Sequence, residues 1–437
     1  MSSITIYEFD ALTPERTATP SVERLHAVPR PVYEWLEEQA LKAAELGKPA
    51  WLRLSQRGGR RVVQVTSYVG VIRAPNGFQI EVLPKIGKAA AGREQENRQL
   101  LIDMLRCLGE FRHIQTDSAK LAATRMPLLE VFIHEFLKAV EHVVKRGLRS
   151  DYMSRQNDLF ALRGKLQLAQ HLRNNLYRKD RFFCAYDEFS TNRPENRLIH
   201  TALNRILLVT SSQENHKLAR ELRFVFADIP LSDQVAQDFR QVRLDRGMIH
   251  YADALAWAKL ILVEDAPLTG SGEHHAPSLL FPMEAVFEAF VAKHLARQLS
   301  PALNLKTQIS NFSLVKHKEQ NWFRLKPDLL IREKNKNLVV LDTKWKLIDS
   351  SKSNGTEKYG LAQSDFYQLQ AYGHSYLDGE GDIVLIYPRT DKFEAPLEVF
   401  SFPKTNGLRL WVLPFCLLHR ILIIPLESEF SSCFHSC

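Results

Sequence analysis

Cysteine is scarce in this sequence: 437 residues contain 5 cysteines, and no two of them form a CxxC pair. This excludes a disulfide framework and a zinc ribbon, and it favours a reducing compartment. Long apolar runs are also missing, because the longest, residues 410–426, is interrupted by His419 and Arg420 and falls short of the ~20 residues that span a bilayer. The first ten residues show no secretory signal. We therefore expect a cytoplasmic protein without a membrane span.

A nucleotide-binding motif is absent as well, since no GxxxxGK[ST] segment occurs in the chain. The bulk composition, 45% hydrophobic and 25% charged, is that of an ordinary globular protein. Basic residues outnumber acidic ones, which gives a formal net charge of +8 and weakly favours a polyanionic partner. A chain of this length is expected to form at least two domains.

The order of patterns along the chain predicts an α+β multidomain protein. Apolar and polar residues alternate between about 50 and 83, with turn signals at 57–59 and 75–77, which predicts a small antiparallel β unit such as a barrel or meander. Helical spacing begins near Arg93 and continues through much of the middle third. We predict an N-terminal β domain, a mainly helical middle region, an α/β domain with a mixed sheet and a divergent tail: residues 1–90, 91–270, 271–418 and 419–437.

Particular elements of the second half follow from the same patterns. After the helical stripe that begins near Arg93, two further helices are expected in the middle region, and a Gly-Ser stretch at 269–272 is taken as the main domain boundary. After that boundary we expect a helix, a strand, two strong strands, a second helix and a further strand. The predicted ranges are 128–144 and 195–208 for the middle helices, then 282–299, 303–309, 325–331, 338–344, 364–377 and 383–387.

The two strong strands carry the residues with the most informative chemistry. They predict a β-hairpin whose turn centres between Asn335 and Lys336, which places Asp328 opposite Asp342 or Thr343. Because side chains of a strand repeat every second residue, Asp342 and Lys344 share one face. Two acids at apolar strand positions repel each other unless a cation lies between them, and Mg²⁺ is commonly held by one or two carboxylates with water and phosphate.

This arrangement has the logic of a phosphodiesterase. A metal at Asp328 and Asp342 would stabilise in-line attack on phosphorus, and the Lys344 ammonium would orient or help to deprotonate the attacking water. The alternative is purely structural: Asp342 and Lys344 form an ordinary ion pair and Asp328 caps a turn. A single D-x-K is common by chance, whereas P-D followed by an apolar strand and D-x-K is considerably rarer.

Further candidate residues lie on the two helices that flank the hairpin. Glu284 and Glu288 are four residues apart on one helix face, and we choose Glu288 as a third metal ligand, the alternative being two solvated acids. Gln368 and Tyr372 are likewise four apart and are candidates to contact DNA phosphate or water, although a polar stripe with a packed tyrosine is an equally good explanation. Tyr367 and Tyr376 are interpreted as core or edge packing.

These motifs together resemble the McrC family, the nuclease partner of the McrB GTPase within the PD-(D/E)xK superfamily. The resemblance covers roughly residues 60–415, and further segments carry it: 68–72, 80–86, 146–148, 162–166 and 192–197. It implies a restriction-endonuclease-like C-terminal domain in which Asp328, Asp342 and Lys344 match the cleavage motif and Gln368 and Tyr372 resemble a pair shared with RecB-like nucleases.

The resemblance also implies partners and a cofactor. It implies a Mg²⁺-dependent endonuclease that acts on double-stranded DNA together with a separate McrB-like AAA+ GTPase. That partner would bind the GTP, because this chain has no GxxxxGK[ST] motif of its own. The β unit before Leu83 and the basic run 57–61 are candidate contacts to that partner, and a solvated basic turn is the alternative for the run. The sequence departs from the family at Cys416, where an acid is expected. The tail beyond it matches nothing in the family: Cys433, His435 and Cys437 are candidates to bind a metal, and a disordered or divergent end is the preferred alternative.

Three rival functions remain open from the sequence. A self-sufficient nuclease would cut plain DNA with metal and no nucleotide. A non-catalytic regulator would only activate a ring NTPase, and the intact Asp328, Asp342 and Lys344 argue against it. A simple nucleic-acid-binding module leaves the converging acids unexplained, because acids disfavour DNA phosphate unless a metal intervenes.

Overall fold

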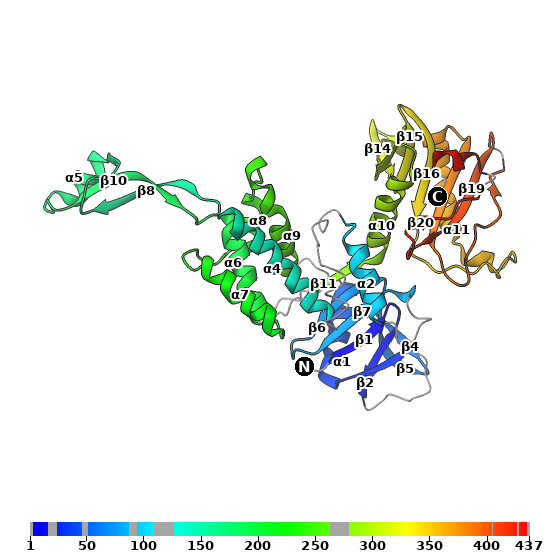
Figure 1. Cartoon of the computed structure of the whole chain (residues 1–437), viewed down its shortest axis with the longest axis horizontal. Coiled ribbons are helices and arrows are strands. Elements are labelled where there is room, and N and C mark those ends of the chain that lie inside the picture. Colours follow the sequence, from blue (N-terminus) through cyan, green and yellow to red (C-terminus); the bar gives the residue numbers. More distant parts are fainter. Residues whose placement is uncertain are drawn as a thin grey trace. The chain divides into compact units, whose positions relative to one another are not determined.

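The structure, a computed structural model, describes residues 3–15, 24–45, 51–86, 94–108, 126–262, 279–403, 405–425 and 428–434. The chain divides into two compact units (Figure 1). The first unites the two ends of the chain and the second is made mainly of the middle, and their bounds are Met1–Gly70, Gln79–Ile114 and Leu280–Cys437, then Val71–Phe78 and Gln115–Leu279. These units group the segments differently from the four predicted domains, whose predicted boundary at 269–272 lies outside the described residues. Helices and mixed sheets confirm the α+β class.

The N-terminal domain contains two four-stranded sheets rather than a single antiparallel meander. Their strand orders are β3-β2-β5-β4 and β1-β7-β6-β11. The predicted turn at Gly58 and Gly59 is confirmed, because it joins β4 to β5 as an antiparallel hairpin. Two parallel pairs, β2 with β3 and β1 with β7, correct the purely antiparallel expectation. The elements are β1 (Ser3–Tyr7), β2 (Ala11–Pro14), β3 (Leu25–Val28), α1 (Arg30–Glu45), β4 (Leu52–Arg57), β5 (Arg60–Val65), β6 (Tyr68–Arg73) and β7 (Gln79–Leu83).

The second unit consists of a helical bundle and a β arm. The bundle confirms the two predicted helices, and Pro194 begins one of them as expected. The helices are α4 (Leu128–Arg146), α6 (Pro194–Leu207), α7 (Gln213–Val225), α8 (Val235–Gln241), η4 (Arg246–Tyr251) and α9 (Ala252–Leu262). The arm was not predicted, and it comprises β8 (Asp151–Leu159), β9 (Lys165–Leu166), α5 (Leu168–Asn175) and β10 (Phe182–Ser190) in a sheet of order β8-β10-β9.

The absence of a strand pattern in the arm has a physical reason. Seven consecutive residues of β8, from Asp151 to Asn157, are exposed, so neither face is selected to be apolar and the sequence shows no alternation. Figure 1 shows the paired β8 and β10 extending beyond helices α6 to α9 of the same unit. A periodic sequence pattern arises only where one face of an element is buried, and the strands of this arm bury little of either face.

Helix α2 (Glu94–Leu105) follows the N-terminal strands, and β11 (Leu279–Pro282), which comes after the second unit in the chain, completes an N-terminal sheet and leads directly into the C-terminal domain. Its main sheet has the order β12-β15-β16-β17-β19-β18, and β20 also pairs with β19. The elements are α10 (Met283–Gln298), β12 (Leu303–Thr307), β13 (Phe312–His317), β14 (Gln320–Leu325), β15 (Leu329–Glu333), β16 (Lys336–Thr343), η5 (Lys358–Gly360), α11 (Gln363–Leu377), β17 (Gly381–Pro388), β18 (Phe400–Ser401), β19 (Leu408–Cys416), β20 (Ile421–Leu422) and η6 (Glu429–Cys433).

The predicted mixed sheet is confirmed, since β16, β17 and β19 are parallel while β12, β15 and β18 join antiparallel. The predicted helices and strands of this half all appear, but the β13–β14 hairpin was missed. Residues beyond 418 are not only a tail, because β20 extends the sheet. Helix α11 lies close on the sheet at Gly373, where an added Cβ would come within 2.6 Å of Leu408 and 2.7 Å of Ile383.

Within the described ranges, no helix combines the length and apolar character needed to cross a membrane.

Candidate functional site

The hairpin of β15 and β16 brings the two predicted acids to the same level. Leu329 pairs with Leu341, so Asp328, immediately before β15, lies level with Asp342. The turn is one residue earlier than predicted, because Lys334 adopts a left-handed backbone with φ of 49° and forms the turn with Asn335. A register shift between Ile331 and Arg332 then restores the pairing of Asp328 with Asp342, one of the two predicted alternatives.

Asp342 is almost completely enclosed, with 1% of its surface exposed. Burial and then the neighbouring charge of Asp328 raise its pKa to about 7, although Lys344 acts in the opposite direction. Asp328 is better satisfied, because one carboxylate oxygen accepts hydrogen bonds from the Thr343 backbone nitrogen at 2.8 Å and from the Thr343 hydroxyl at 2.7 Å. The two acids therefore differ: Asp328 is held by donors, while Asp342 resists ionisation.

Lys344 follows β16 and forms an ion pair with the Asp342 carboxylate. Its backbone nitrogen donates to the Ile386 carbonyl at 2.9 Å, which fixes the end of the strand against β17. Burial lowers the pKa of Lys344, but the charges of Asp342 and Asp328 outweigh this and raise it, so the ammonium remains protonated at neutral pH. The Asp342–Lys344 ion pair, which the purely structural alternative predicts, is thus present.

An ordinary ion pair leaves Asp342 unsatisfied. The buried Oδ1 atom of Asp342 has no hydrogen-bond donor among the described residues, and a buried carboxylate oxygen without a donor is costly. The charge of a divalent cation beside Asp328 and Asp342 would remove that cost and favour the ionised form of Asp342. The carboxylate chemistry and the enclosed, undonated oxygen therefore fit Mg²⁺ better than they fit a simple salt bridge.

Glu288, the third predicted ligand, lies near the pair but is engaged elsewhere. Gln308 donates its side-chain amide to Glu288 at 3.0 Å, and its backbone nitrogen donates to the Asp328 carbonyl at 2.9 Å. Burial and the charge of Asp328 raise the pKa of Glu288. Nevertheless, the described part of the chain contains no cluster of three or more acids, histidines or cysteines arranged to hold a metal ion. Glu284 is exposed, whereas Val286, Phe287 and Phe290 are buried as predicted.

The second helix of the site, α11, contributes a tyrosine that is fixed by hydrogen bonds. Gln368 donates to the Tyr372 hydroxyl at 2.6 Å, and this hydroxyl donates to the Lys326 carbonyl at 2.9 Å. Tyr372 is buried, and burial together with the charges of Asp342 and Asp328 raises its pKa. Tyr376 is buried as predicted, while the packing role predicted for Tyr367 is wrong, since its side chain is 63% exposed.

One acid near the site was missed from the sequence. Asp365, in the first turn of α11, lies close enough for its charge to raise the pKa values of Asp342 and Lys344. It accepts a hydrogen bond of 3.4 Å from the buried Tyr387 hydroxyl. Its position three residues before Gln368 places both on one helix face, which is the signal that would have found it.

Other sequence candidates have local structural explanations. In the basic run 57–61, Arg57 donates to the carbonyls of Arg24 and Phe9, and Arg61 pairs with Glu37. Cys416 is buried at the end of β19 and supplies no carboxylate there. Cys433 is a buried free thiol, and His435 and Cys437 lie outside the described residues.

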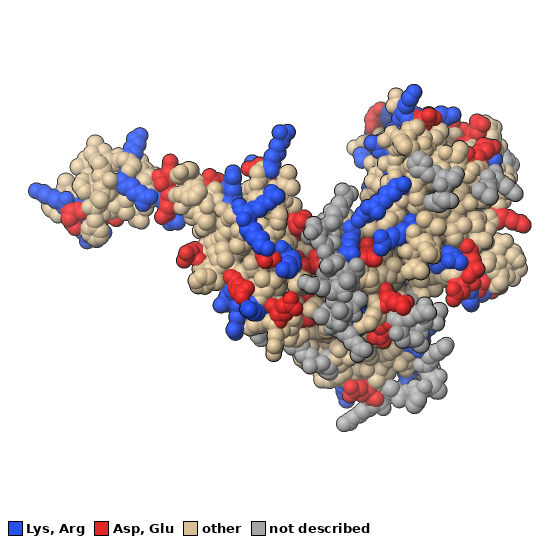
Figure 2. Space-filling model, in the orientation of Figure 1, with Lys and Arg blue, Asp and Glu red and all other residues tan. Residues whose placement is uncertain are grey.

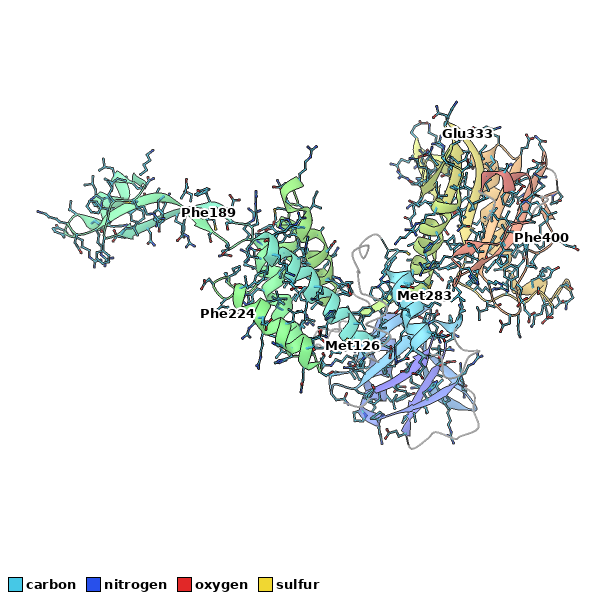
Figure 3. All side chains as sticks on the ribbon, viewed as in Figure 1. Met126, Phe189, Phe224, Met283, Glu333 and Phe400 are labelled. Atoms are coloured by element: carbon cyan, nitrogen blue, oxygen red, sulfur yellow. The ribbon has the colours of Figure 1, made fainter. Side chains whose placement is uncertain are left out.

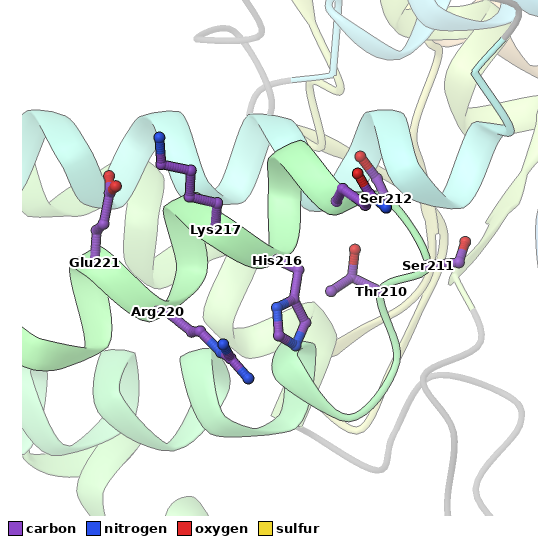
Figure 4. Close-up of a pocket in the computed structure, with 8 residues that line it drawn as sticks. Thr210, Ser211, Ser212, His216, Lys217, Arg220 and Glu221 are labelled. Atoms are coloured by element: carbon purple, nitrogen blue, oxygen red, sulfur yellow. The ribbon is translucent and has the colours of Figure 1, made fainter.

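A hollow of about 380 Å³ lies at the start of α7, lined by Thr210, Ser211, Ser212, Gln213, His216, Lys217, Arg220 and Glu221 (Figure 4). The donors at its edge already have an internal acceptor, because Glu130 accepts from Thr210, from Ser211 and from Asn215. These bonds outweigh burial and lower the pKa of Glu130. These bonds explain the polar residues at one edge of the hollow, and Asp328 and Asp342 remain the main candidate site.

Two facing acids and a lysine at the ends of adjacent strands of a mixed sheet are typical of metal-dependent phosphodiester hydrolases. The chain belongs to the McrBC 5-methylcytosine restriction system component family, whose model matches residues 63–388. A curated relative, the Type IV methyl-directed restriction enzyme EcoKMcrBC of Escherichia coli (strain K12), is 23% identical over 277 residues, which are 60% of this chain and 78% of the relative. The chain is thus a restriction system component.

Two solved structures from Thermococcus gammatolerans share the fold. One, a half-complex of McrB AAA+ hexamers with bound McrC, contains a chain that aligns with a TM-score of 0.66 and 20% identity over 97% of both chains. The other, an McrBC complex, aligns with a TM-score of 0.50 and 20% identity over 68% of this chain and 88% of that one. Because the first alignment covers nearly the whole chain, the likeness in fold extends to both compact units.

Proposed function

We propose that this chain is the DNA endonuclease subunit of a modification-dependent restriction system, with a PD-(D/E)xK-type site that uses Mg²⁺. The observation that carries the proposal is the buried Asp342, which faces Asp328, pairs with Lys344 and keeps one oxygen without a donor. A binding module has no need for such a cluster, because acids repel phosphate.

Each residue of the site has a distinct task in this proposal. Asp328 and Asp342 would hold Mg²⁺, which when bound polarises the scissile phosphate and lowers the pKa of an attacking water. Lys344 keeps its proton at neutral pH and is partly exposed, so its ammonium can orient that water and stabilise charge on the phosphate. Glu288 lies within electrostatic range of Asp328 and would be the third carboxylate that holds the ion.

Gln368 and Tyr372 fix the backbone segment that leads into Asp328. Tyr372 anchors the Lys326 carbonyl, two residues before Asp328, and Gln368 fixes the Tyr372 hydroxyl. Tyr376 adds bonds to the carbonyls of Ile309 and Leu325. These three side chains thereby secure both ends of the β13–β14 hairpin beside the site.

The β13–β14 hairpin is suited to contact DNA. Its outer face pairs Val315 with Trp322, and the exposed Trp322 and His317 rings lie 4.7 Å apart between centroids. Lys318 and Arg324, which are exposed on the same hairpin within two residues of these rings in the sequence, add positive charge. Aromatic rings flanked by cations bind nucleic acid by stacking and by phosphate contacts. Replacing Trp322 by alanine should weaken DNA binding without changing stability, because the side chain is 45% exposed.

The chain would act with a separate McrB-like AAA+ GTPase. The arm of the second unit favours this proposal, because it exposes large apolar side chains that do not pack into the core of the chain. These are Tyr152, Phe160, Leu162, Leu168, Leu176, Tyr177 and Phe189. Figure 3 labels Phe189 on this arm, and most of the arm's visible surface in Figure 2 is neither acidic nor basic. Exposed apolar patches of this kind mark protein interfaces.

The decisive experiment is cleavage of modified and unmodified plasmid with Mg²⁺, by the chain alone and with its neighbouring NTPase plus GTP or ATP. We expect cutting of modified DNA only in the complete GTP mixture, and loss of cutting in Asp342→Ala and Lys344→Ala. Lys336→Ala is the matched control, because Lys336 lies on the same strand but at its exposed end.

Each rival function predicts a different result. Cutting by the chain alone would identify a self-sufficient nuclease. Stimulated NTP hydrolysis without cutting would identify a non-catalytic regulator. Equal cutting by Asp342→Ala and the wild type would refute the assignment of the site.

A further inference from the structure

The residue that follows the candidate lysine is held by the other end of the chain. Trp345, directly after Lys344, is buried, and its indole nitrogen donates to both carboxylate oxygens of Glu8, at 3.1 Å and 2.9 Å. The Trp345 carbonyl accepts a hydrogen bond of 2.8 Å from the Lys85 ammonium. Glu8, Lys85 and Trp345 all belong to the first compact unit.

Glu8 and Lys85 lie beside each other at the ends of two strands of the N-terminal domain. Glu8 directly follows β1 and Lys85 lies two residues after β7, and these strands are parallel neighbours in register from Ser3 to Tyr7. The Lys85 backbone nitrogen donates to the Glu8 carboxylate at 3.0 Å. The ends of two adjacent strands therefore present one acid and one amine together.

Both charges are deeply buried, which is expensive unless they are fully engaged. Glu8 is 0% exposed and Lys85 is 9% exposed. The Lys85 ammonium lies 4.9 Å from the centroid of the Phe9 ring and 5.6 Å from that of Trp345, in addition to its bond to the Trp345 carbonyl. The Trp345 indole thus donates a hydrogen bond to Glu8 at its edge and has the Lys85 ammonium over its face.

Trp345 in turn contacts both sides of the candidate site. Along the chain it follows Lys344, so a displacement of its backbone moves the end of β16. Its ring lies 5.3 Å between centroids from Phe287, the neighbour of Glu288 on α10. One enclosed side chain therefore links the strand that carries Asp342 and Lys344 to the helix that carries Glu288.

We propose that Glu8 and Lys85 are positioning residues of the Asp328–Asp342–Lys344 site and act through Trp345. The proposal rests on the proposed nuclease function and deepens it, because it makes the N-terminal domain part of the site's support. Groups that hold metal ligands from outside commonly contribute 10-fold to 100-fold in metal affinity or activity, on the order of magnitude expected here.

A double-mutant cycle tests this route. Glu8→Ala and Trp345→Phe each remove one partner of the same hydrogen bond, and Phe keeps an aromatic ring beside Phe287. Each single variant should lower the cleavage rate of the complete mixture roughly 10-fold or more. The double variant should be no slower than the slower single variant, because the bond is already absent. Independent structural damage would instead multiply the two effects.

Metal binding gives a readout that does not need catalysis. Calorimetric titration of the chain alone with Mg²⁺ should show weaker binding in Glu8→Ala and in Trp345→Phe, with no further loss in the double variant. If the wild type binds Mg²⁺ but cuts no DNA, the proposed function fails while this titration still decides the positioning role. Lys85→Met, which keeps the aliphatic stem and removes the ammonium, replaces Glu8→Ala if that variant does not fold.

Arg98→Met is the matched control. It breaks the Arg98–Glu81 ion pair of 2.6 Å, a partly buried charge pair of β7 and α2 that does not include Trp345. We expect this variant to cut DNA and bind Mg²⁺ as the wild type does. Multiplying effects in the cycle, unchanged single variants, or an equal loss in Arg98→Met would each overturn the proposal.

Discussion

The substitution Asp342→Asn should stabilise the metal-free protein at neutral and alkaline pH. Asparagine has nearly the shape of a protonated aspartate, so it removes the charge without leaving a cavity. In the folded chain the pKa of Asp342 is raised from its ordinary value of 3.8 to about 7, chiefly by burial and then by Asp328. Above pH ~7 the wild type must therefore ionise Asp342 in surroundings that disfavour its charged form.

The sign and size of the effect follow from proton linkage. Because the folded pKa exceeds the unfolded pKa, the folded state binds more protons between roughly pH 4 and pH 7, and the free energy of unfolding falls as pH rises through this window. A tenfold change in a protonation equilibrium is about 1.4 kcal/mol, so the full contribution above pH ~8 is on the order of 4 kcal/mol. Below pH ~4 both states are protonated and the substitution should change little.

Thermal unfolding of the metal-free proteins at a series of pH values measures this difference. At pH 8 we expect Asp342→Asn to melt roughly 10 °C above the wild type, and the gap should close as pH falls toward 4. The pKa of about 7 already includes the attraction of Lys344 for the ionised Asp342, so the expected gap is what remains after the ion pair has stabilised the wild type. Parallel curves for the two proteins between pH 4.5 and 8 would refute the idea that Asp342 is held protonated by the fold.

Three further predictions concern the site, the core and the arm. Mg²⁺ at 100 times its Kd should stabilise the wild type by about 2.7 kcal/mol in thermal shift and leave Asp342→Asn unaffected, and an equal shift in both would place the ion elsewhere. Gly373→Ala should destabilise the C-terminal domain by about 1–3 kcal/mol in urea unfolding, because the new methyl group overlaps Leu408 and Ile383. The control Gly355→Ala should change the free energy of unfolding little, because Gly355 has open space around it. Tyr177→Ser, at a side chain that is 93% exposed, should leave stability within about 0.5 kcal/mol but weaken binding to the NTPase in a pull-down titration, and unchanged binding would remove Tyr177 from the interface.

The sequence predicted those elements whose burial follows a regular period. Helices α4, α6, α10 and α11 were found because one face of each is apolar, and β16 was found as a continuous apolar run. The arm was missed because its strands bury neither face, and the β13–β14 hairpin was missed for the same reason. The turn of the β15–β16 hairpin was misplaced by one residue, because no rule from composition predicts that Lys334 adopts positive φ.

The candidate site was predictable only where local geometry determined it. Strand periodicity alone places Asp342 and Lys344 on one face, and hairpin pairing alone brings Asp328 level with Asp342, so both followed from spacing. Asp365 and Gln308 reach the site from other elements, and their approach depends on how α11 packs on the sheet and how β12 pairs with β15.

What the sequence by itself determined was therefore the local chemistry: a hairpin with two acids and a lysine, on a chain that carries no nucleotide-binding motif. What only the tertiary structure decided was the environment of that chemistry, because burial and long-range contacts depend on the whole fold. The raised pKa of Asp342 needs the enclosing sheet, and the bond between Glu8 and Trp345 joins residues 337 positions apart. No pattern of local spacing encodes a contact of that range, since it arises only when the first strand and the C-terminal sheet meet.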